Sequence, residues 1–214
     1  MMIKRVLIIL FSFTALFGCE STYYAAMEKV GQHKRDILVD RVESASEAQE
    51  EAQAEFKDAL THLSLLINFD GGDLAQQYEL SQSHFDASKS AADEVSNKIQ
   101  AIENVAEALF EEWQEEINLY SSASLKAQSQ AKLASTQRQY RSLLKAMYAA
   151  EKRMSPVLAA LQDNVLFLKH NLNAKAIGAL QGEYQTIKRD IERLINDMNV
   201  AIKQSNNFVQ QITE

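Results

Sequence analysis

Apolar residues recur along most of the chain at alternating spacings of three and four, which places them on one face of a long α-helix. The first such series predicts a helix over residues 24–67. Its apolar seam runs through Leu38, Val42, Ala45, Gln49, Ala52, Phe56, Ala59, Leu63 and Leu66. Because eight of these nine positions are apolar, we expect this face to be buried against other helices.

Three further series predict three more long helices. The second helix is expected over residues 74–120, with a later seam at Phe85, Ala92, Val95, Ile99, Ile102, Ala106, Leu109, Trp113 and Tyr120. The seam of the third is Leu133, Gln137, Tyr140, Leu144, Met147, Glu151, Met154, Leu158, Leu161, Val165, Leu168 and Leu172. The fourth is expected to start near Asn173, a suitable N-cap, with a seam at Ile177, Leu180, Tyr184, Ile187, Ile191, Leu194, Met198, Ala201, Ser205, Phe208 and Ile212.

Short polar segments separate the series. Residues 68–73 contain the only Gly-Gly pair of the chain, which suits a helix end, and Asp73 is a good N-cap for the next helix. Serines at 121, 122 and 124 mark a weaker break.

Pro156 leaves two interpretations of the third helix. Ser155-Pro156 could start a new helix, because proline suits the first helical position. The apolar phase is nevertheless the same on both sides, since Met147, Met154 and Leu161 lie seven residues apart. We therefore predict one helix with a kink rather than a reversal of direction.

The connections are short, and short connections join antiparallel neighbours. The predicted fold is therefore all-α: an elongated, up-down-up-down bundle of four long heptad-patterned helices. A helix of about 45 residues is roughly 70 Å long at 1.5 Å per residue. An extended coiled coil that forms a homo-oligomer has the same seam and stays open as an alternative.

Composition narrows the fold and the partners. The 214 residues include one Pro and six Gly, fewer than strands and tight turns usually need, which argues against an all-β or α/β fold. The formal net charge is -7, which argues against a nucleic-acid partner.

The N-terminus has the features of a secretion signal. Lys4 and Arg5 precede an apolar run over residues 6–17, whose twelve residues are too few to span a bilayer comfortably. The run ends in Leu16-Phe17-Gly18-Cys19, which resembles the lipobox of bacterial lipoproteins. The alternative is a plain secretory signal that is followed by an incidental cysteine.

The lipobox resemblance implies three segments: a signal peptide over 1–18, a tether over 19–23 that is acylated on Cys19, and one helical domain over 24–214. The membrane would then be a partner through the lipid anchor. In Gram-negative lipoproteins an Asp after the cysteine favours the inner membrane. Because Glu20 occupies that position here, the expected location is the outer membrane, facing the periplasm.

Several segments together resemble one uncharacterised bacterial family. They are the lipobox, Phe69-Asp70-Gly71-Gly72-Asp73-Leu74, Pro156-Val157-Leu158, and the stretch over 165–174 that contains Lys169-His170-Asn171. The family is the domain of unknown function family twenty-nine fifty-nine. The resemblance implies a helical lipoprotein of the cell envelope and supplies no activity.

A search for chemistry gives no catalytic residue, metal site or cofactor. No histidine (33, 62, 84 or 170) follows a Glu three residues earlier, so the di-iron pattern of helix bundles is absent from the sequence. Asp58 and His62, four residues apart, are expected to make a surface contact. The sequence contains no phosphate-binding loop and no Gly-x-Ser-x-Gly motif, and its single cysteine is assigned to the lipid.

We therefore expect a non-enzymatic spacer, scaffold or adaptor that binds another envelope protein. The alternative is a periplasmic enzyme or ligand-binding module with a site in the bundle core. In the predicted topology the first and third connections share the end far from the membrane. The expected partner contact there is Phe69, Asp70, Gly71, Gly72, Asp73, Lys169, His170 and Asn171, unless Phe69 serves only to plug the core.

Overall fold

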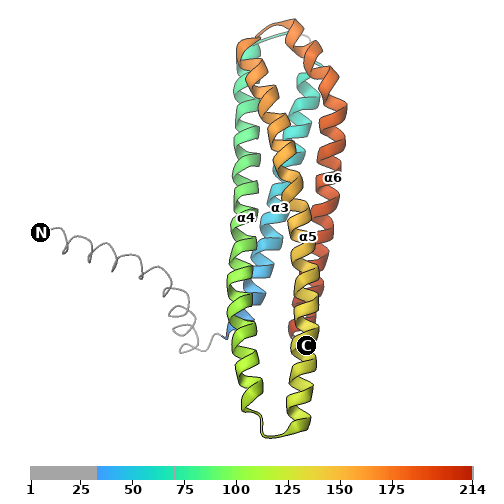
Figure 1. Cartoon of the computed structure of the whole chain (residues 1–214). Helices are drawn as coiled ribbons and strands as arrows, with labels where there is room; N and C mark the ends of the chain where they lie inside the picture. Colours follow the sequence, from blue (N-terminus) through green and yellow to red (C-terminus); the bar gives the residue numbers. More distant parts are fainter. Residues whose placement is uncertain (1–32, 70, 214) are drawn as a thin grey trace, which may run out of the picture.

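A computed structural model describes residues 33–69 and 71–213, and within these residues it contains four helices and no strand (Figure 1). The helices are α3 (Lys34–Leu66), α4 (Leu74–Leu119), α5 (Ala123–His170) and α6 (Ala174–Thr213). The prediction of an all-α fold is confirmed. The signal peptide, Cys19 and its tether, Asp70 and Glu214 lie outside the described residues.

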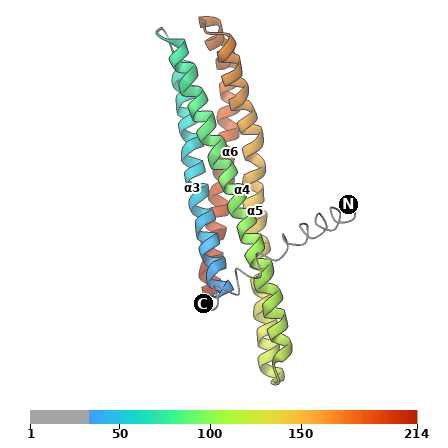
Figure 2. The same ribbon diagram turned by 90° about the vertical axis from the view of Figure 1, so that its left-hand side faces the viewer.

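The four helices form an elongated antiparallel bundle (Figures 1 and 2). Helix α3 packs against α4 and α6, and α5 packs against the same two helices, so the four surround one core. The up-down-up-down order that short connections predict is therefore confirmed. No described helix is both long and apolar enough to cross a bilayer.

The bundle has a two-helix extension at one end, because α4 and α5 reach further than α3 and α6 (Figure 2). Lys34 at the start of α3 forms an ion pair with Glu112 of α4, with 2.9 Å between Nζ and Oε1. Near the end of α6, the Gln211 carbonyl accepts a hydrogen bond of 3.3 Å from Lys132 Nζ. Residues 113–131 lie beyond these contacts, and we call them the hairpin extension.

The predicted seams of the first and fourth helices form most of the core. All nine seam residues of α3 are buried, Gln49 included, and so are ten of the eleven in α6, with Tyr184 half-buried. In α4 the seam is buried from Ala92 to Leu109, whereas Phe85 and Trp113 are half-buried and Tyr120 is exposed. Burial of these apolar faces is what stabilises helices of this length.

The prediction for the third helix was half wrong. Met147, Met154, Leu161 and Leu168 are buried as expected. Four of the alternate positions are shifted by one residue, since the side chains at the predicted positions Gln137, Leu144, Glu151 and Leu158 are only half-buried. The buried ones are instead Thr136, Leu143, Ala150 and Val157. Val165, a later alternate position, is buried as predicted. The apolar pairs Leu143-Leu144 and Val157-Leu158 give the sequence two equivalent stripes, and contact with both α4 and α6 selects one.

Of three predictions about where helices start or continue, the structure confirms two and corrects one. Asp73 caps α4 by accepting hydrogen bonds from the amides of Ala75 and Gln76. Helix α5 continues through Pro156, as the constant phase indicated. The first helix begins at Lys34 rather than at residue 24, because the backbone of His33 is extended; residues 24–32 lie outside the described residues.

Gln49 is the polar exception in the core, and it supplies a test of the packing. Its side chain is fully buried, and neither amide atom has a hydrogen-bond partner among the described residues. Gln49→Leu keeps a similar volume and removes this cost, so it should raise the free energy of unfolding by about 1–3 kcal/mol. Urea denaturation monitored by circular dichroism measures the change.

Gln53 is the matched control one turn later. Its Nε2 donates a 3.0 Å hydrogen bond to Asn199 Oδ1 of α6. Gln53→Leu leaves Asn199 without this donor, so it should not stabilise the bundle. A destabilised Gln49→Leu variant would contradict the packing described for this part of α3.

Candidate functional site

The two connections that were expected to share an end do so. The turn between α3 and α4 and the turn between α5 and α6 both lie at the end opposite the hairpin extension (Figures 1 and 2). Gln181 of α6 fastens this end by donating a 2.7 Å hydrogen bond to the carbonyl of Ile67. We call this the far end.

Phe69 covers the first turn rather than standing free of it. Its side chain is half-buried and packs against the core. Gly72 has a φ of 130°, and a Cβ at this glycine would lie 2.9 Å from Cζ of the Phe69 ring. The positive φ of Gly72 favours glycine at this position. The contact of the Phe69 ring with this turn and with the core favours the interpretation of Phe69 as a plug.

The other predicted contact residues lie in the two turns of the far end. Gly71, Gly72 and Asp73 are exposed in the first turn. Lys169 and His170 are exposed at the end of α5, and Asn171 Nδ2 ends that helix by donating to the Phe167 carbonyl. Asp70 lies outside the described residues. The partner contact itself stays a prediction.

Sequence reasoning missed exposed apolar side chains at the far end. Leu166, Phe167 and Leu172 are all partly exposed, although Leu172 was assigned to the seam. Leu166 and Phe167 lie outside the predicted seam of α5, and this position in the sequence could have indicated their exposure. These side chains add apolar area beside the polar residues of the predicted contact.

A histidine pair joins α3 to α4 below the far end. Nε2 of His62 lies 2.8 Å from Oγ of Ser81, and its ring stacks on His84 with 5.1 Å between ring centroids. Because the Ser81 hydroxyl donates to the Gln77 carbonyl, its oxygen accepts the proton of His62 Nε2. His62 thus faces α4, and not Asp58 as its spacing had suggested.

Burial keeps this pair from acting as an ordinary ligand site. The pKa of His62 is lowered, first by burial and then by the nearby charge of His84. The cavity beside the two rings has a volume of only about 20 Å³, which is room for about one water molecule. No group of three or more potential metal-ligating His, Cys, Asp or Glu side chains occurs in the part of the chain that the structure describes.

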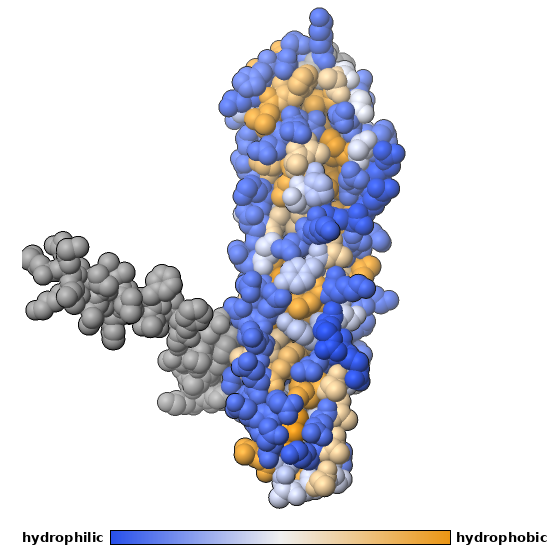
Figure 3. Space-filling model, viewed as in Figure 1, coloured by the Kyte–Doolittle hydropathy of each residue, from blue (hydrophilic) through white to orange (hydrophobic). Residues whose placement is uncertain are grey.

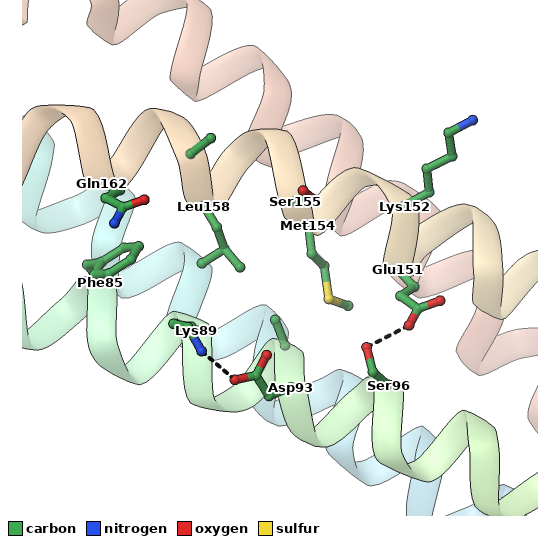
Figure 4. A pocket seen from close by; sticks show the side chains of 12 residues that line it. Phe85, Lys89, Asp93, Ser96, Glu151, Lys152, Met154, Ser155, Leu158 and Gln162 are labelled. Carbon is green, nitrogen blue, oxygen red and sulfur yellow. Dashed lines mark hydrogen bonds and ion pairs between the residues drawn. The ribbon is translucent and has the colours of Figure 1, made fainter.

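An open groove of about 660 Å³ lies between α4 and α5 (Figure 4). Phe85 of α4 and Met154 and Leu158 of α5 point into it and form an apolar floor. Such a floor suits an apolar ligand or a side chain of a partner better than a polar substrate.

Four polar side chains at the rim of the groove form two pairs with one another. Lys89 forms an ion pair with Asp93, with 2.7 Å between Nζ and Oδ2. Ser96 Oγ donates a 2.6 Å hydrogen bond to Glu151 Oε1 across the two helices (Figure 4). The Ser96–Glu151 contact joins α4 to α5, whereas the Lys89–Asp93 pair lies within α4. Together they occupy the two acidic side chains of the groove.

Comparison with known families now adds to this geometry. The model of a family described as "protein of unknown function", DUF2959, matches residues 23–212. The chain belongs to the DUF2959 family. The match includes all four described helices and both turns of the far end, and it confirms the family that the sequence motifs indicated. None of the curated proteins matches the chain.

The lowered pKa of His62 predicts that the stability of this DUF2959 protein depends on pH. The pKa of His62 is lowered in the folded state, whereas in the unfolded chain the pKa of this side chain is about 6.5. Above that pH His62 is neutral in both states and its contribution is fully present. As pH falls below it, the unfolded chain gains a proton that the folded state resists, so stability is lost until the folded pKa is passed.

Replacement of His62 tests this link. When pH falls from about 7.5 to about 5, the melting temperature should decrease by less in the His62→Gln variant than in the unaltered chain. His170→Gln is the control, because His170 is exposed. Equal pH dependence of the His62→Gln variant and the unaltered chain would show that His62 is not held in its neutral form.

Proposed function

We propose that this protein is a bacterial lipoprotein that is acylated on Cys19, and that its bundle is a non-enzymatic spacer, scaffold or adaptor in the cell envelope. The observation that carries the proposal is a lipobox that precedes an elongated helical bundle in the chain. Residues 16–19 match the lipobox, and α3 begins at Lys34, fifteen residues after Cys19.

The shape of the bundle suits a spacer. Helix α5 alone has 48 residues, which corresponds to about 72 Å at 1.5 Å per residue. A rod of this length carries its far end well away from a surface that holds the other end. The exposed residues of the far end are then in a position to contact an envelope partner.

The apolar side chains that fill the core also support a structural role. Apolar seam residues fill it along α3 and α6, and the histidine pair borders only a very small cavity. A catalytic or binding site normally needs a hollow with several convergent polar groups. The alternative, a ligand-binding module, draws its support from the groove between α4 and α5 with its apolar floor.

The proposed location is the outer membrane, on the side that faces the periplasm, with the inner membrane as the less favoured site. The basis is Glu20, which follows the cysteine where an Asp would favour retention in the inner membrane. Two or more acyl chains on one cysteine are sufficient for stable anchoring.

Cys19→Ser tests the anchor in cells. Without the thiol, no acyl chain is attached, so the variant should lose labelling by a palmitate analogue and leave the membrane fraction. Glu20→Asp is the matched control: it keeps Cys19 and its label, and it should move the protein from the outer to the inner membrane. A Cys19→Ser variant that is still labelled would refute the proposed anchor.

A further inference from the structure

The tip of the hairpin extension carries large apolar side chains that are exposed to solvent. Leu119 is 83% exposed, Leu125 is 53% exposed and Tyr120 is 43% exposed. We call these three residues the apolar tip. They lie at the connection between α4 and α5, the lower end of Figure 3, where orange, tan and near-white atoms replace much of the blue.

Charge is missing from the same stretch. Residues 117–125 contain no Asp, Glu, Lys or Arg, although nearly a quarter of the whole chain is charged. The nearest acidic residues are Glu115 and Glu116, about one helical turn before the tip, and Lys126 follows it. Tyrosine is a side chain that prefers the interface between bilayer and water, because its ring is apolar and its hydroxyl is polar.

The chain enters the bundle on the side of this tip. Lys34, the first residue of α3, pairs with Glu112, and Tyr120 is eight residues further along α4. The tip therefore extends about 12 Å beyond the start of α3 at 1.5 Å per residue. Residues 19–33 can span at most about 50 Å when fully extended, so an anchor at Cys19 is within reach of the tip.

We propose that the apolar tip inserts into the interface of the bilayer that holds the acylated Cys19. This inference rests on the lipid anchor of the proposed function. A lipid surface is the occupant that fits, because three side chains are far fewer than the about 20–30 residues per partner of a stable protein interface. The bilayer is also the one surface that the tether keeps next to the tip.

The insertion gives the rod a second point of attachment. Acylation of Cys19 alone is a single point of attachment, which does not fix the angle between the bundle and the membrane. Contact of the apolar tip holds the hairpin extension against the bilayer and directs the far end away from it. The lack of charge in residues 117–125 avoids the cost of placing an ionic group at that depth.

The test uses an indole at the tip of the full, acylated chain. Trp113 is the single Trp, so Trp113→Phe removes the background signal. Leu119→Trp, with Leu125→Trp as a second variant, is then made in this background. The protein is reconstituted in phosphatidylcholine vesicles with or without brominated acyl chains; this zwitterionic lipid does not repel the acidic chain.

The matched control is Leu172→Trp in the same background. Leu172 is 47% exposed beside the turn between α5 and α6, at the far end. Circular dichroism shows whether each variant keeps its helices. Flotation with the vesicles shows separately whether the acylated chain is membrane-bound.

We expect the indoles at positions 119 and 125 to emit at shorter wavelength and to be quenched by brominated lipid, while the indole at position 172 is not quenched. A chain that floats but whose indoles at 119 and 125 are not quenched overturns the insertion and leaves the anchor intact. An emission shift without quenching overturns it in favour of contact with protein. A chain that does not float overturns the anchor, and the insertion falls with it.

Discussion

Burial of the heptad seam between four antiparallel helices is the interaction on which the rest of this molecule depends. Isolated helices gain little from propensity alone, so helices of 33 to 48 residues persist here because each presents an apolar face to two neighbours. Helix α3 shows this most completely, since every seam position from Leu38 to Leu66 is buried. The same packing fills the interior, and the groove between α4 and α5 is open to the surface.

Helix length then gives the bundle two different ends. Helices α4 and α5 extend further than α3 and α6, so one end of the bundle consists of a two-helix hairpin. Helix α3 begins at Lys34, beside the base of this hairpin. The other end is closed by two turns, by the Phe69 ring over Gly72 and by the Gln181 contact to Ile67. The proposed role as a spacer or adaptor requires a membrane anchor at the first end, and it would use the exposed polar and apolar surface at the second. The DUF2959 match over residues 23–212 covers both ends.

Periodicity and capping chemistry predicted much of this fold, for local reasons. Asp73 and the Gly-Gly turn act within a few residues, and the seams of α3 and α6 each have one dominant apolar stripe. Sequence reasoning failed where the answer depends on neighbouring helices. The rotation of α5 is decided by its contacts with α4 and α6, and His62 pairs with Ser81 from another helix. The exposed Leu119 and Leu172 were missed because exposure there depends on how far adjacent helices extend.

The central claim is that one chain closes its own core as an elongated four-helix rod. Small-angle X-ray scattering of the Cys19→Ser chain, which carries no acyl group, tests this most directly. The account predicts a monomer with a radius of gyration well above the roughly 17 Å of a compact globule of 214 residues, and a maximum dimension of at least about 70 Å. A compact monomer, or an oligomer about twice as long as α5, would contradict it.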